Sequence, residues 1–386
     1  MKKVLLIGAR LHGNLGGPLI LNSVLEILRK IDSSIVFTYL SPDPKDAIFA
    51  REYNINIKSM PIGRRTGIIK GLFTLFREIL RADIVLDVWG LEFSDTLNYS
   101  FMNKFLEGFH YFIAKLTGKP IIKIPADMGP FNNLWNRVFA KIYLNMASLI
   151  FVRSIETKKL LRKLGIRAPI YVCPDVAFYC DMGTRLLRKT KEQGILIGVS
   201  ISHTTLRNTR KKGKYLSLLL NAIEYLLSKY KDVRIVLIPN EVYEEKQLDD
   251  MTLSLITLNL INPRYRARIA IYRPRKILDI RDMRNLVRQC DLIIASRYHM
   301  LVLSLTECIP AIVFSWPHKY KGLMKLYGME EHVYNINTVS FKEFKASIDK
   351  ILQRKTEIQK RIARTLPSIC QVIYYYIKRF VYEKYL

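Results

Sequence analysis

The chain has 386 residues, which is enough for two domains that each bury a core of their own. Its hydrophobic content of 49% and charged content of 25% are ordinary for a folded soluble protein, but its formal net charge of +29 is not. Such an excess of Lys and Arg indicates an anionic partner: nucleic acid, an anionic membrane surface or an acidic substrate. The basic residues are spread along the chain without zinc-finger spacing or an RNA-recognition signature, so we expect no nucleic-acid partner.

The cysteines and the N-terminus bear on the compartment. The five cysteines are odd in number and show no paired metal spacing, which indicates a reducing compartment with mostly buried thiols. We see no signal peptide before the first predicted strand, and no apolar run reaches the about 18 residues of a membrane span. We therefore expect a cytoplasmic protein, with attachment to the inner face of the membrane as a further option.

Strands and helices alternate along the first half of the chain. Apolar runs predict strands at residues 4–8, 35–40, 84–88, 120–125 and 149–152. Helical periodicity predicts helices at residues 18–30, 67–81, 98–116, 134–146 and 155–164. Strands that alternate with helices favour a mainly parallel sheet covered on both faces.

A basic, polar segment at residues 181–193 breaks this pattern and is the expected linker. Beyond it, we predict strands at residues 194–200, 233–239, 268–272, 291–295 and 310–314, and helices at 215–229, from about 241, and at 300–307. The expected fold is α/β, with two Rossmann-like domains facing a cleft in a glycosyltransferase-B-like architecture. The expected domains are residues 1–182 and 194–366. A basic, aromatic C-terminal helix at 367–386 then either docks on the body or lies on a membrane surface.

Charged residues gather around two predicted strand ends in the second half. Ser296, Arg297 and His299 follow the strand at 291–295 and open the next helix, where free backbone N–H groups and the helix dipole favour an anion. Ligands of such β-α-β units bind beyond the carboxyl ends of the strands. An acidic small molecule is therefore the first ligand to expect. The alternative is that Arg297 and His299 only cap a helix and satisfy the core.

An ordered set of motifs resembles those of the polysaccharide pyruvyl transferase family, over roughly residues 4–330. The motifs are Gly13-Asn14-Leu15-Gly16, Trp89-Gly90-Leu91-Glu92-Phe93-Ser94-Asp95, Pro125-Ala126-Asp127-Met128-Gly129-Pro130-Phe131, Phe151-Val152-Arg153-Ser154, Pro174-Asp175-Val176-Ala177-Phe178, Ser296-Arg297-Tyr298-His299 and His318-Lys319-Tyr320-Lys321-Gly322. The chain departs from the family pattern at Gly17-Pro18, where an acidic residue is usual, and at Trp89-Gly90, where the family has three consecutive glycines.

The resemblance implies transfer of a pyruvyl group from phosphoenolpyruvate to a sugar of a cell-surface polysaccharide or lipid-linked glycan, which gives a ketal and phosphate. Phosphoenolpyruvate is then the donor substrate, and no cofactor is expected. Arg297 would bind its phosphate or carboxylate bidentately, and His299 would protonate its methylene carbon. The other expected donor contacts are Ser296, His318, Lys319, Lys321 and Arg153. The alternatives are a solvated surface for either lysine and a structural salt bridge for Arg153.

The resemblance places the acceptor in the first domain and the donor in the second. Gly13 and Asn14 would admit a sugar or phosphate close to the backbone, and Asp95 and Asp127 would hydrogen-bond acceptor hydroxyls. Each aspartate also fits a plain loop or helix-cap role. The loop has neither Walker nor dinucleotide-site spacing, and the scattered histidines without a carboxylate cluster predict no metal site.

Two other functions stay open at this point. One is a nucleotide-sugar-dependent glycosyltransferase of glycosyltransferase-B form, in which Arg297 and a lysine would hold a diphosphate. The other is a non-catalytic relative that binds glycan or membrane. The basic charge would suit peripheral association with a membrane that carries the acceptor. No interface pattern predicts an oligomeric state.

Overall fold

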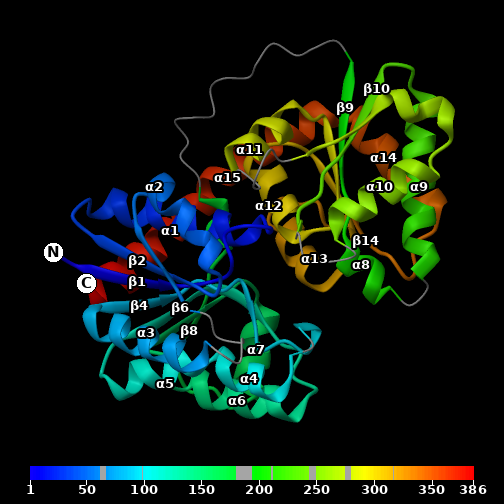
Figure 1. Cartoon of the computed structure of the whole chain (residues 1–386). Helices are drawn as coiled ribbons and strands as arrows, with labels where there is room; N and C mark the ends of the chain where they lie inside the picture. The colour runs from blue at the N-terminus through cyan, green and yellow to red at the C-terminus, as the bar shows by residue number, and fades with distance from the viewer. Residues whose placement is uncertain are drawn as a thin grey trace. The chain divides into compact units, whose positions relative to one another are not determined.

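The computed structural model describes residues 1–60, 67–97, 99–179, 194–209, 212–242, 249–273, 280–315 and 317–386. These residues form two compact α/β units (Figure 1). The first unit comprises Met1–His12, Gly16–Tyr179 and Ile369–Leu386, and the second comprises Gly13–Leu15 and Cys180–Ser368. The expected linker at 181–193 lies outside the described residues. No described helix is long and apolar enough to cross a membrane.

The first unit is built on an eight-stranded sheet in the order β3-β2-β1-β4-β6-β7-β8, with β5 paired to β6. All of these pairs are parallel, as the alternation of strands and helices predicts. The strands are β1 (Lys3–Ile7), β2 (Val36–Ser41), β3 (Asn56–Ser59), β4 (Ile84–Asp87), β5 (Leu91–Glu92), β6 (Ile121–Met128), β7 (Leu149–Val152) and β8 (Ile170–Val172). Residues Val4–Ile7 are all buried, as expected for a central strand covered on both faces.

Helices cover both faces of this sheet (Figure 1). They are α1 (Gly16–Ile31), α2 (Ala50–Tyr53), α3 (Ile68–Arg81), α4 (Phe101–Glu107), α5 (Phe109–Leu116), α6 (Leu134–Leu144) and α7 (Ile155–Lys163). The helix expected at 98–116 is two helices that meet at Gly108. A Cβ on Gly108 would stand 2.2 Å from the Tyr143 ring, so the close approach of α6 requires a glycine at this break.

Strand β6 is longer than the strand expected at 120–125. It continues to Met128, and its register with β7 shifts between Lys123 and Ala126. Pro125 stands within this shift, where a strand can accommodate a residue without a backbone N–H. The irregular strand end carries Asp127 past the point that a regular apolar run would indicate.

The second unit has a six-stranded parallel sheet in the order β11-β10-β9-β12-β13-β14. The strands are β9 (Ile195–Ser200), β10 (Val233–Leu237), β11 (Ile269–Ile271), β12 (Leu292–Ala295), β13 (Ala311–Ser315) and β14 (Val333–Asn335). The helices before the C-terminal segment are α8 (His203–Asn208), α9 (Lys212–Lys229), α10 (Asp250–Leu260), α11 (Ile280–Gln289), α12 (Tyr298–Thr306), α13 (Pro317–Lys325) and α14 (Phe341–Gln353). The helix expected from about 241 falls partly outside the described residues, and α10 begins at Asp250.

The C-terminal segment does not start a separate helix at 367. Helix α15 (Lys355–Ile377) begins in the second unit, and from Ile369 the chain groups with the first unit, through a π-helix at Lys378–Tyr382 and α16 (Glu383–Tyr385). Its aromatic rings pack on the first unit, with the Tyr376 and Phe151 centroids 5.9 Å apart. Tyr382 Oη also donates to Asp32 at 3.0 Å. The segment therefore takes the docked position of the two expected.

Because Ile377 is fully buried, Ile377→Ala should lower the free energy of unfolding by about 2–5 kcal/mol. Val372 lies on the same helix but is 40% exposed, so Val372→Ala is the matched control and should cost about 0.5 kcal/mol or less. Denaturant unfolding of both variants measures the difference. Equal effects would mean that the C-terminal segment is not part of the folded core.

Candidate functional site

Four ionisable side chains meet at the carboxyl ends of three neighbouring strands in the second unit. His203 opens α8 beyond β9, Glu241 and Asp250 follow β10, and Arg297 is the N-cap residue of α12 beyond β12. Strands β10, β9 and β12 lie side by side in one parallel sheet, which brings residues far apart in the sequence to one edge. The charged site predicted beyond the strand at 291–295 therefore centres on Arg297.

The Arg297 guanidinium contacts two carboxylates at once. Its Nε lies 3.0 Å from Asp250 Oδ2 and its Nη2 lies 2.6 Å from Asp250 Oδ1, which makes a bidentate pair. The same Nη2 lies 2.6 Å from Glu241 Oε2 and 3.1 Å from His203 Nδ1. Among the described residues, none hydrogen-bonds Nη1, and 19% of the side chain is exposed. One edge of the guanidinium is thus used inside the unit, and Nη1 is available to a ligand.

Asp250 anchors this arrangement. Its buried carboxylate accepts hydrogen bonds from the backbone N–H groups of His203, Asn240 and Glu241 at distances of 2.9, 3.3 and 3.1 Å. Burial alone would raise the pKa of Asp250, but the Arg297 charge and the hydrogen bonds from His203 outweigh burial and hold this pKa below its ordinary value. Burial likewise acts to lower the pKa of Arg297, and the charges of Asp250 and Glu241 raise it above its ordinary value instead. Asp250 and Arg297 are therefore both charged at neutral pH.

Ser296, an expected donor contact, is hydrogen-bonded inside the unit. It is 1% exposed, and its hydroxyl accepts a hydrogen bond from Tyr215 Oη at 2.9 Å. Its carbonyl oxygen accepts from the hydroxyls of Thr205 and Tyr320, at 3.3 and 3.4 Å. These bonds fix the end of β12, and with it the backbone that carries Arg297.

His299, the expected general acid, stands in the first turn of α12 two residues after Arg297. It is half-buried, and its ring packs edge-on against Tyr298 with the centroids 5.5 Å apart. The structure thus puts His299 at the same helix N-terminus as Arg297, as the motif predicts. Its role in proton transfer stays a prediction.

Gly13 and Asn14, expected on the acceptor side, group with the second unit. Asn14 forms an isolated antiparallel bridge with Glu241. The Val242 N–H donates to the Gly13 carbonyl at 2.9 Å, and the Leu15 N–H donates to the Asn240 carbonyl at 3.2 Å. The glycine-rich loop therefore lies beside Glu241, one of the two carboxylates that contact Arg297.

The motif that begins at His318 lies in α13, a helix that the sequence pattern did not predict. The side chains of His318 and Lys319 lie outside the described residues, so their donor contacts stay predictions. Lys321 is exposed, and Tyr320, which stands before it, is buried with its ring 5.9 Å from that of Tyr298. Tyr320 therefore joins this motif to the residues on either side of Arg297, through the Tyr298 ring and the Ser296 carbonyl.

Arg153, another expected donor contact, is bound by aspartates of the first unit. Its Nη1 lies 3.3 Å from Asp127 Oδ2 and donates to the Gly90 carbonyl at 3.0 Å, and its Nη2 lies 2.7 Å from Asp175 Oδ2. The Arg153 side chain is 5% exposed. A Cβ on Gly90 would stand 3.0 Å from Arg153 Nη2, so this glycine makes room for the guanidinium. Arg153 thus has the contacts of a structural salt bridge, which was the alternative to its role as a donor contact. Its partners in this salt bridge are Asp127 and Asp175.

Asp95, the second aspartate assigned to the acceptor, holds the loop before α6. Its carboxylate accepts hydrogen bonds from the N–H groups of Asn132 and Asn133, at 2.5 and 3.2 Å. The side-chain amide of Asn136 donates to its other oxygen at 2.6 Å. These are the contacts of a loop-holding aspartate, and they use both carboxylate oxygens.

A second ionisable cluster, buried in the first unit, was not predicted. It joins Asp87 at the end of β4, Glu92 in β5, His110 in α5 and Lys123 in β6. Lys123 Nζ lies 2.8 Å from Asp87 Oδ1 and 2.6 Å from Glu92 Oε2, and His110 Nε2 lies 2.9 Å from Asp87 Oδ2. Asp87 and Lys123 have no exposed side-chain surface, so their charges depend on each other.

The acidic groups of this cluster differ in pKa. Burial acts to raise the pKa of Asp87, but Lys123 and His110 outweigh burial and hold it below its ordinary value. At Glu92, burial and the adjacent Asp87 charge outweigh Lys123 and hold the pKa well above its ordinary value. Glu107, whose Oε1 accepts the Phe93 N–H at 3.0 Å, belongs to the same region, and burial raises its pKa to about 7.

Among the described residues, potential metal ligands come together in two groups. One group is Asp87, Glu92 and His110, and the other is His203, Glu241 and Asp250. Each group already contains a protein cation between its carboxylates, which is Lys123 in the first and Arg297 in the second. In each group the carboxylates therefore already have a cationic partner within the protein.

The residues missed by the sequence analysis differ in the signal they carry. His203 follows the predicted strand at 194–200, so the strand-end rule points to it directly. Asp87 and Lys123 stand inside predicted apolar strands, where a charged residue signals a buried pair. Asp250 has no comparable signal, because it is far in sequence from its partner Arg297.

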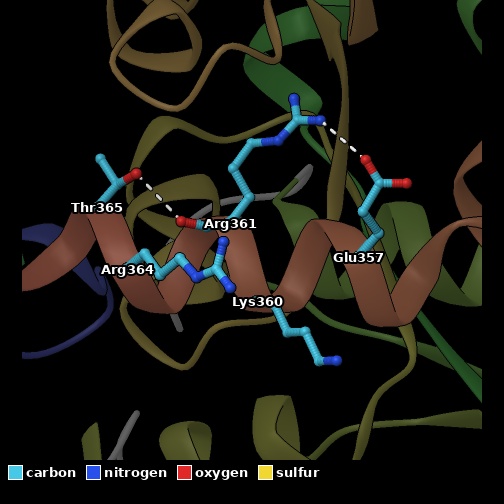
Figure 2. Close-up of a pocket in the computed structure, with 5 residues that line it drawn as sticks. All are labelled: Glu357, Lys360, Arg361, Arg364 and Thr365. Carbon is cyan, nitrogen blue, oxygen red and sulfur yellow. Dashed lines mark hydrogen bonds and ion pairs between the residues drawn. The ribbon is translucent and has the colours of Figure 1, made fainter.

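A surface hollow of about 430 Å³ lies along α15, lined by Glu357, Lys360, Arg361, Arg364 and Thr365 (Figure 2). Arg361 reaches Glu357 at 3.4 Å and Thr365 donates to the Arg361 carbonyl at 3.0 Å (Figure 2). All five residues come from one helix, and Lys360 and Arg364 are exposed. We therefore assign the candidate site to the convergent, partly buried groups around Arg297 and not to this hollow.

Lys123→Met should lower the free energy of unfolding by about 3–5 kcal/mol, because it leaves the charge of Asp87 buried without its lysine partner. Lys159 on α7 is exposed, so Lys159→Met is the matched control and should change stability by about 0.5 kcal/mol or less. Denaturant unfolding at neutral pH measures both. A Lys123→Met variant as stable as the control would contradict the ion-pair cluster.

Glu107 should make the first unit less stable as the pH rises. The pKa of Glu107 is about 7 in the folded chain and 4.5, its ordinary value, in the unfolded chain. Between these two pH values Glu107 is therefore protonated in the folded chain and ionised in the unfolded chain. The unfolding free energy must therefore fall as the pH rises through this window, by up to about 3 kcal/mol. Glu107→Gln should remove this term, so the variant should gain stability relative to wild type between about pH 5 and pH 8. If the stability difference between Glu107→Gln and wild type were the same at about pH 5 and pH 8, the raised pKa of Glu107 would be refuted.

Comparison with known proteins identifies the family. Residues 14–318 match the family described as polysaccharide pyruvyl transferase. The chain is also similar to the amylovoran biosynthesis protein AmsJ of Erwinia amylovora, with 21% identity over 94% of this chain and 95% of that protein.

Solved structures agree with the fold. The chain resembles S. aureus MnaA with UDP, with a TM-score of 0.64, 14% identity and coverage of 99% of this chain and 97% of that one. It resembles Anabaena HepE in complex with UDP-glucose, with a TM-score of 0.63, 12% identity and coverage of 99% of each chain. At such identities the likeness shows the fold alone, and it confirms the expected α/β class with two Rossmann-like domains of glycosyltransferase-B type.

The family match covers most of the chain, from Asn14 to His318, and so includes Arg297 and His299. It agrees with the ordered motifs of the sequence and with the two parallel sheets of the fold. This chain belongs to the polysaccharide pyruvyl transferase family and is an enzyme of that family.

Proposed function

We propose that this enzyme transfers a pyruvyl group from phosphoenolpyruvate to a sugar of a cell-surface polysaccharide or lipid-linked glycan, forming a ketal and releasing phosphate. The family supports an action on polysaccharide. The observation that carries the choice of donor is Arg297, which stands at the N-terminus of α12 with a fixed guanidinium plane and Nη1 open. His299 follows it one residue beyond Tyr298.

The donor carries a phosphate and a carboxylate, and the site offers what an anion of this kind requires. Arg297 is a permanent cation, and its bidentate pair with Asp250 fixes its orientation before a ligand binds. The first backbone N–H groups of α12 add the positive end of a helix dipole at the same place. Glu241 acts in the opposite sense, because its carboxylate repels an incoming anion and holds Arg297 until the anion replaces it.

The chemistry that we assign to His299 is proton transfer. As a general acid it protonates the methylene carbon of phosphoenolpyruvate, which leaves an oxocarbenium-like centre at the carbon that bears the phosphate. A sugar hydroxyl attacks this centre, and its proton replaces the one that His299 gave up. A second hydroxyl of the same sugar then displaces phosphate, which takes up the second hydroxyl proton, so that two C–O bonds form, the C–O bond to phosphate breaks and a methyl group remains. No oxidation or cofactor is involved.

The contacts that Asp95, Asp127 and Asn14 make in the structure indicate which of them is the better candidate to bind the acceptor. Asp95 already uses both carboxylate oxygens to hold the Asn132 loop, so it would have to exchange a protein contact for a sugar hydroxyl, whereas Asp127 uses Oδ2 for Arg153. Asn14 stands beside Glu241 in the second unit and is the stronger candidate for a contact near the reacting groups. We propose a cytoplasmic reaction, since the buried thiols Cys173 and Cys290, which form no disulfide, favour a reducing compartment.

Calorimetric titration with phosphoenolpyruvate should show saturable binding that weakens at least about tenfold in Arg297→Ala, because a charge-assisted contact is lost. His299→Ala should keep most of the binding and lose turnover. Glu241→Gln should bind phosphoenolpyruvate more tightly than wild type, since the competing carboxylate is gone. The matched control is Arg354→Ala, an exposed arginine of the same unit paired with Glu357, and it should bind as wild type does.

A uridine-diphosphate sugar serves as the competing ligand in the same titration. Binding of the nucleotide sugar alone would replace the proposal by a glycosyltransferase reaction. Phosphoenolpyruvate binding that Arg297→Ala leaves intact would refute the proposed donor site. Turnover is measured as phosphate released from phosphoenolpyruvate in the presence of a cell-envelope glycan fraction.

A further inference from the structure

Helix α3 is amphipathic, and its apolar side is wider than the part that packs on the first unit. Gly71, Leu75 and Ile79 are buried against the first unit. Ile69, Phe73, Phe76 and Leu80 follow one another at steps of four, three and four residues, so they share one side of the helix, and they are exposed by 86%, 65%, 39% and 46%. An amphipathic helix normally turns its whole apolar side toward other parts of the protein. The outer side of α3 therefore lacks the polar character expected of a surface in contact with water.

The same feature continues over the neighbouring helices. Figure 1 shows α3, α5, α6 and α4 on one side of the first sheet, and the pairs α3–α5, α5–α6 and α4–α6 are in contact. Together these four helices hold half of the exposed large apolar side chains among the described residues. Outside α3 these are Phe101, Met102, Phe112, Leu116, Leu134, Trp135 and Ile142. We call this set, with the four residues of α3, the apolar face.

Aromatic contacts join the helices of the apolar face. Trp135 packs edge-on against Phe101 with the centroids 4.8 Å apart, and both also contact Phe139. From Phe139 the chain of rings runs through Phe105 to Phe109 and on to Phe112, at centroid distances of 5.8, 5.5 and 5.6 Å. The exposed rings of α4, α5 and α6 are thus the outer members of one packed aromatic layer.

The exposed charged side chains on the helices of the apolar face have one sign. Lys70, Arg81, Lys115, Arg137 and Lys141 are exposed on the same four helices. The acidic residues of these helices are Glu78 and Glu107, and neither is exposed. Glu78 is buried and lies 2.8 Å from Lys58. The surface therefore presents aromatic and aliphatic groups among cations, without an exposed carboxylate on these helices.

We propose that the apolar face binds the surface of an anionic lipid bilayer. Phe, Trp and Leu side chains at the interface, with Lys and Arg at headgroup level, are the combination by which peripheral helices lie on anionic membranes. A second copy of this chain fits less well, because it would bring the same unbalanced cations together on a protein whose net charge is already +29. The apolar face also replaces the C-terminal helix as the membrane contact, since that helix is packed on the first unit.

This inference does not depend on the proposed reaction. It rests on the apolar face of the first unit, whereas the proposed donor site rests on Arg297 in the second. An enzyme that binds membranes without binding phosphoenolpyruvate would support the one and refute the other. If both hold, the membrane contact would bring the enzyme to an acceptor that is itself anchored in the bilayer.

The test is co-sedimentation of the full chain with phosphatidylcholine vesicles, prepared with and without phosphatidylglycerol. Wild type should bind the phosphatidylglycerol vesicles, and raised salt should weaken this binding. The combined variant Ile69→Ser, Phe73→Ser and Leu116→Ser should bind at least about tenfold more weakly. The combined variant Lys70→Gln, Lys115→Gln and Lys141→Gln should lose most of the preference for phosphatidylglycerol.

The matched control replaces three exposed apolar residues of α10 in the second unit, as Leu255→Ser, Ile256→Ser and Leu260→Ser, which are 38%, 39% and 54% exposed in wild type. It should bind vesicles as wild type does. Circular dichroism and thermal unfolding establish that each variant is folded, and the replaced residues are exposed enough to expect this. Failure of wild type to bind either vesicle, or full binding by the α3–α5 serine variant, would overturn the proposal. A dimer in sedimentation velocity that this variant dissociates, without vesicle binding, would instead make a second copy the occupant.

Discussion

Asp250 carries a negative charge inside the second unit, and a buried charge is tolerated only where it is paired and hydrogen-bonded. This requirement draws together the ends of three strands. The carboxylate takes N–H groups from the segments after β9 and β10 and both Nε and Nη2 from the arginine after β12. The position of Arg297 is therefore a consequence of satisfying Asp250, and its open Nη1 is what remains for a ligand. Without Asp250, Arg297 would be one more flexible cation on a protein that has many.

The first unit contains a similar arrangement with a different outcome. Asp46 accepts the N–H groups of Leu11 and His12, and its Oδ1 lies 2.6 Å from His12 Nδ1, much as Asp250 holds His203. At the end of β4, however, the charge of Asp87 is met by Lys123 and His110 inside the core. Both Rossmann-like units thus hold a histidine by a buried aspartate. In the first unit the neighbouring Arg10 Nε lies 3.5 Å from a different aspartate, Asp43, whereas in the second Arg297 makes a bidentate pair with the buried aspartate itself. This difference supports a division of labour in which the second unit binds the anionic donor.

Much of the fold followed from local pattern, because central parallel strands such as β1, β4 and β12 are short apolar runs bounded by polar residues. The position of Arg297 and His299 at a helix N-terminus beyond a strand end could also be predicted from the sequence, and their roles stay predictions. The features that could not be predicted depend on contacts between residues that are distant in the sequence. Nothing near Gly13 indicates its pairing with Val242, and only the Tyr143 ring explains why Gly108 divides the helix predicted at 98–116. The apolar face was missed for a related reason, since periodicity shows that α3 is apolar but not which of its sides the fold covers.

We propose that the edge of Arg297 left free by Asp250 binds the anionic donor, and a crystal structure of the protein with phosphoenolpyruvate would show whether it does. We expect electron density for the ligand with a phosphate or carboxylate oxygen within hydrogen-bond distance of Arg297 Nη1, at the N-terminus of α12, while the Asp250 pair stays in place. Density confined to the basic hollow along α15, or an Arg297 that keeps all of its contacts beside an empty helix N-terminus, would contradict it (Figure 2).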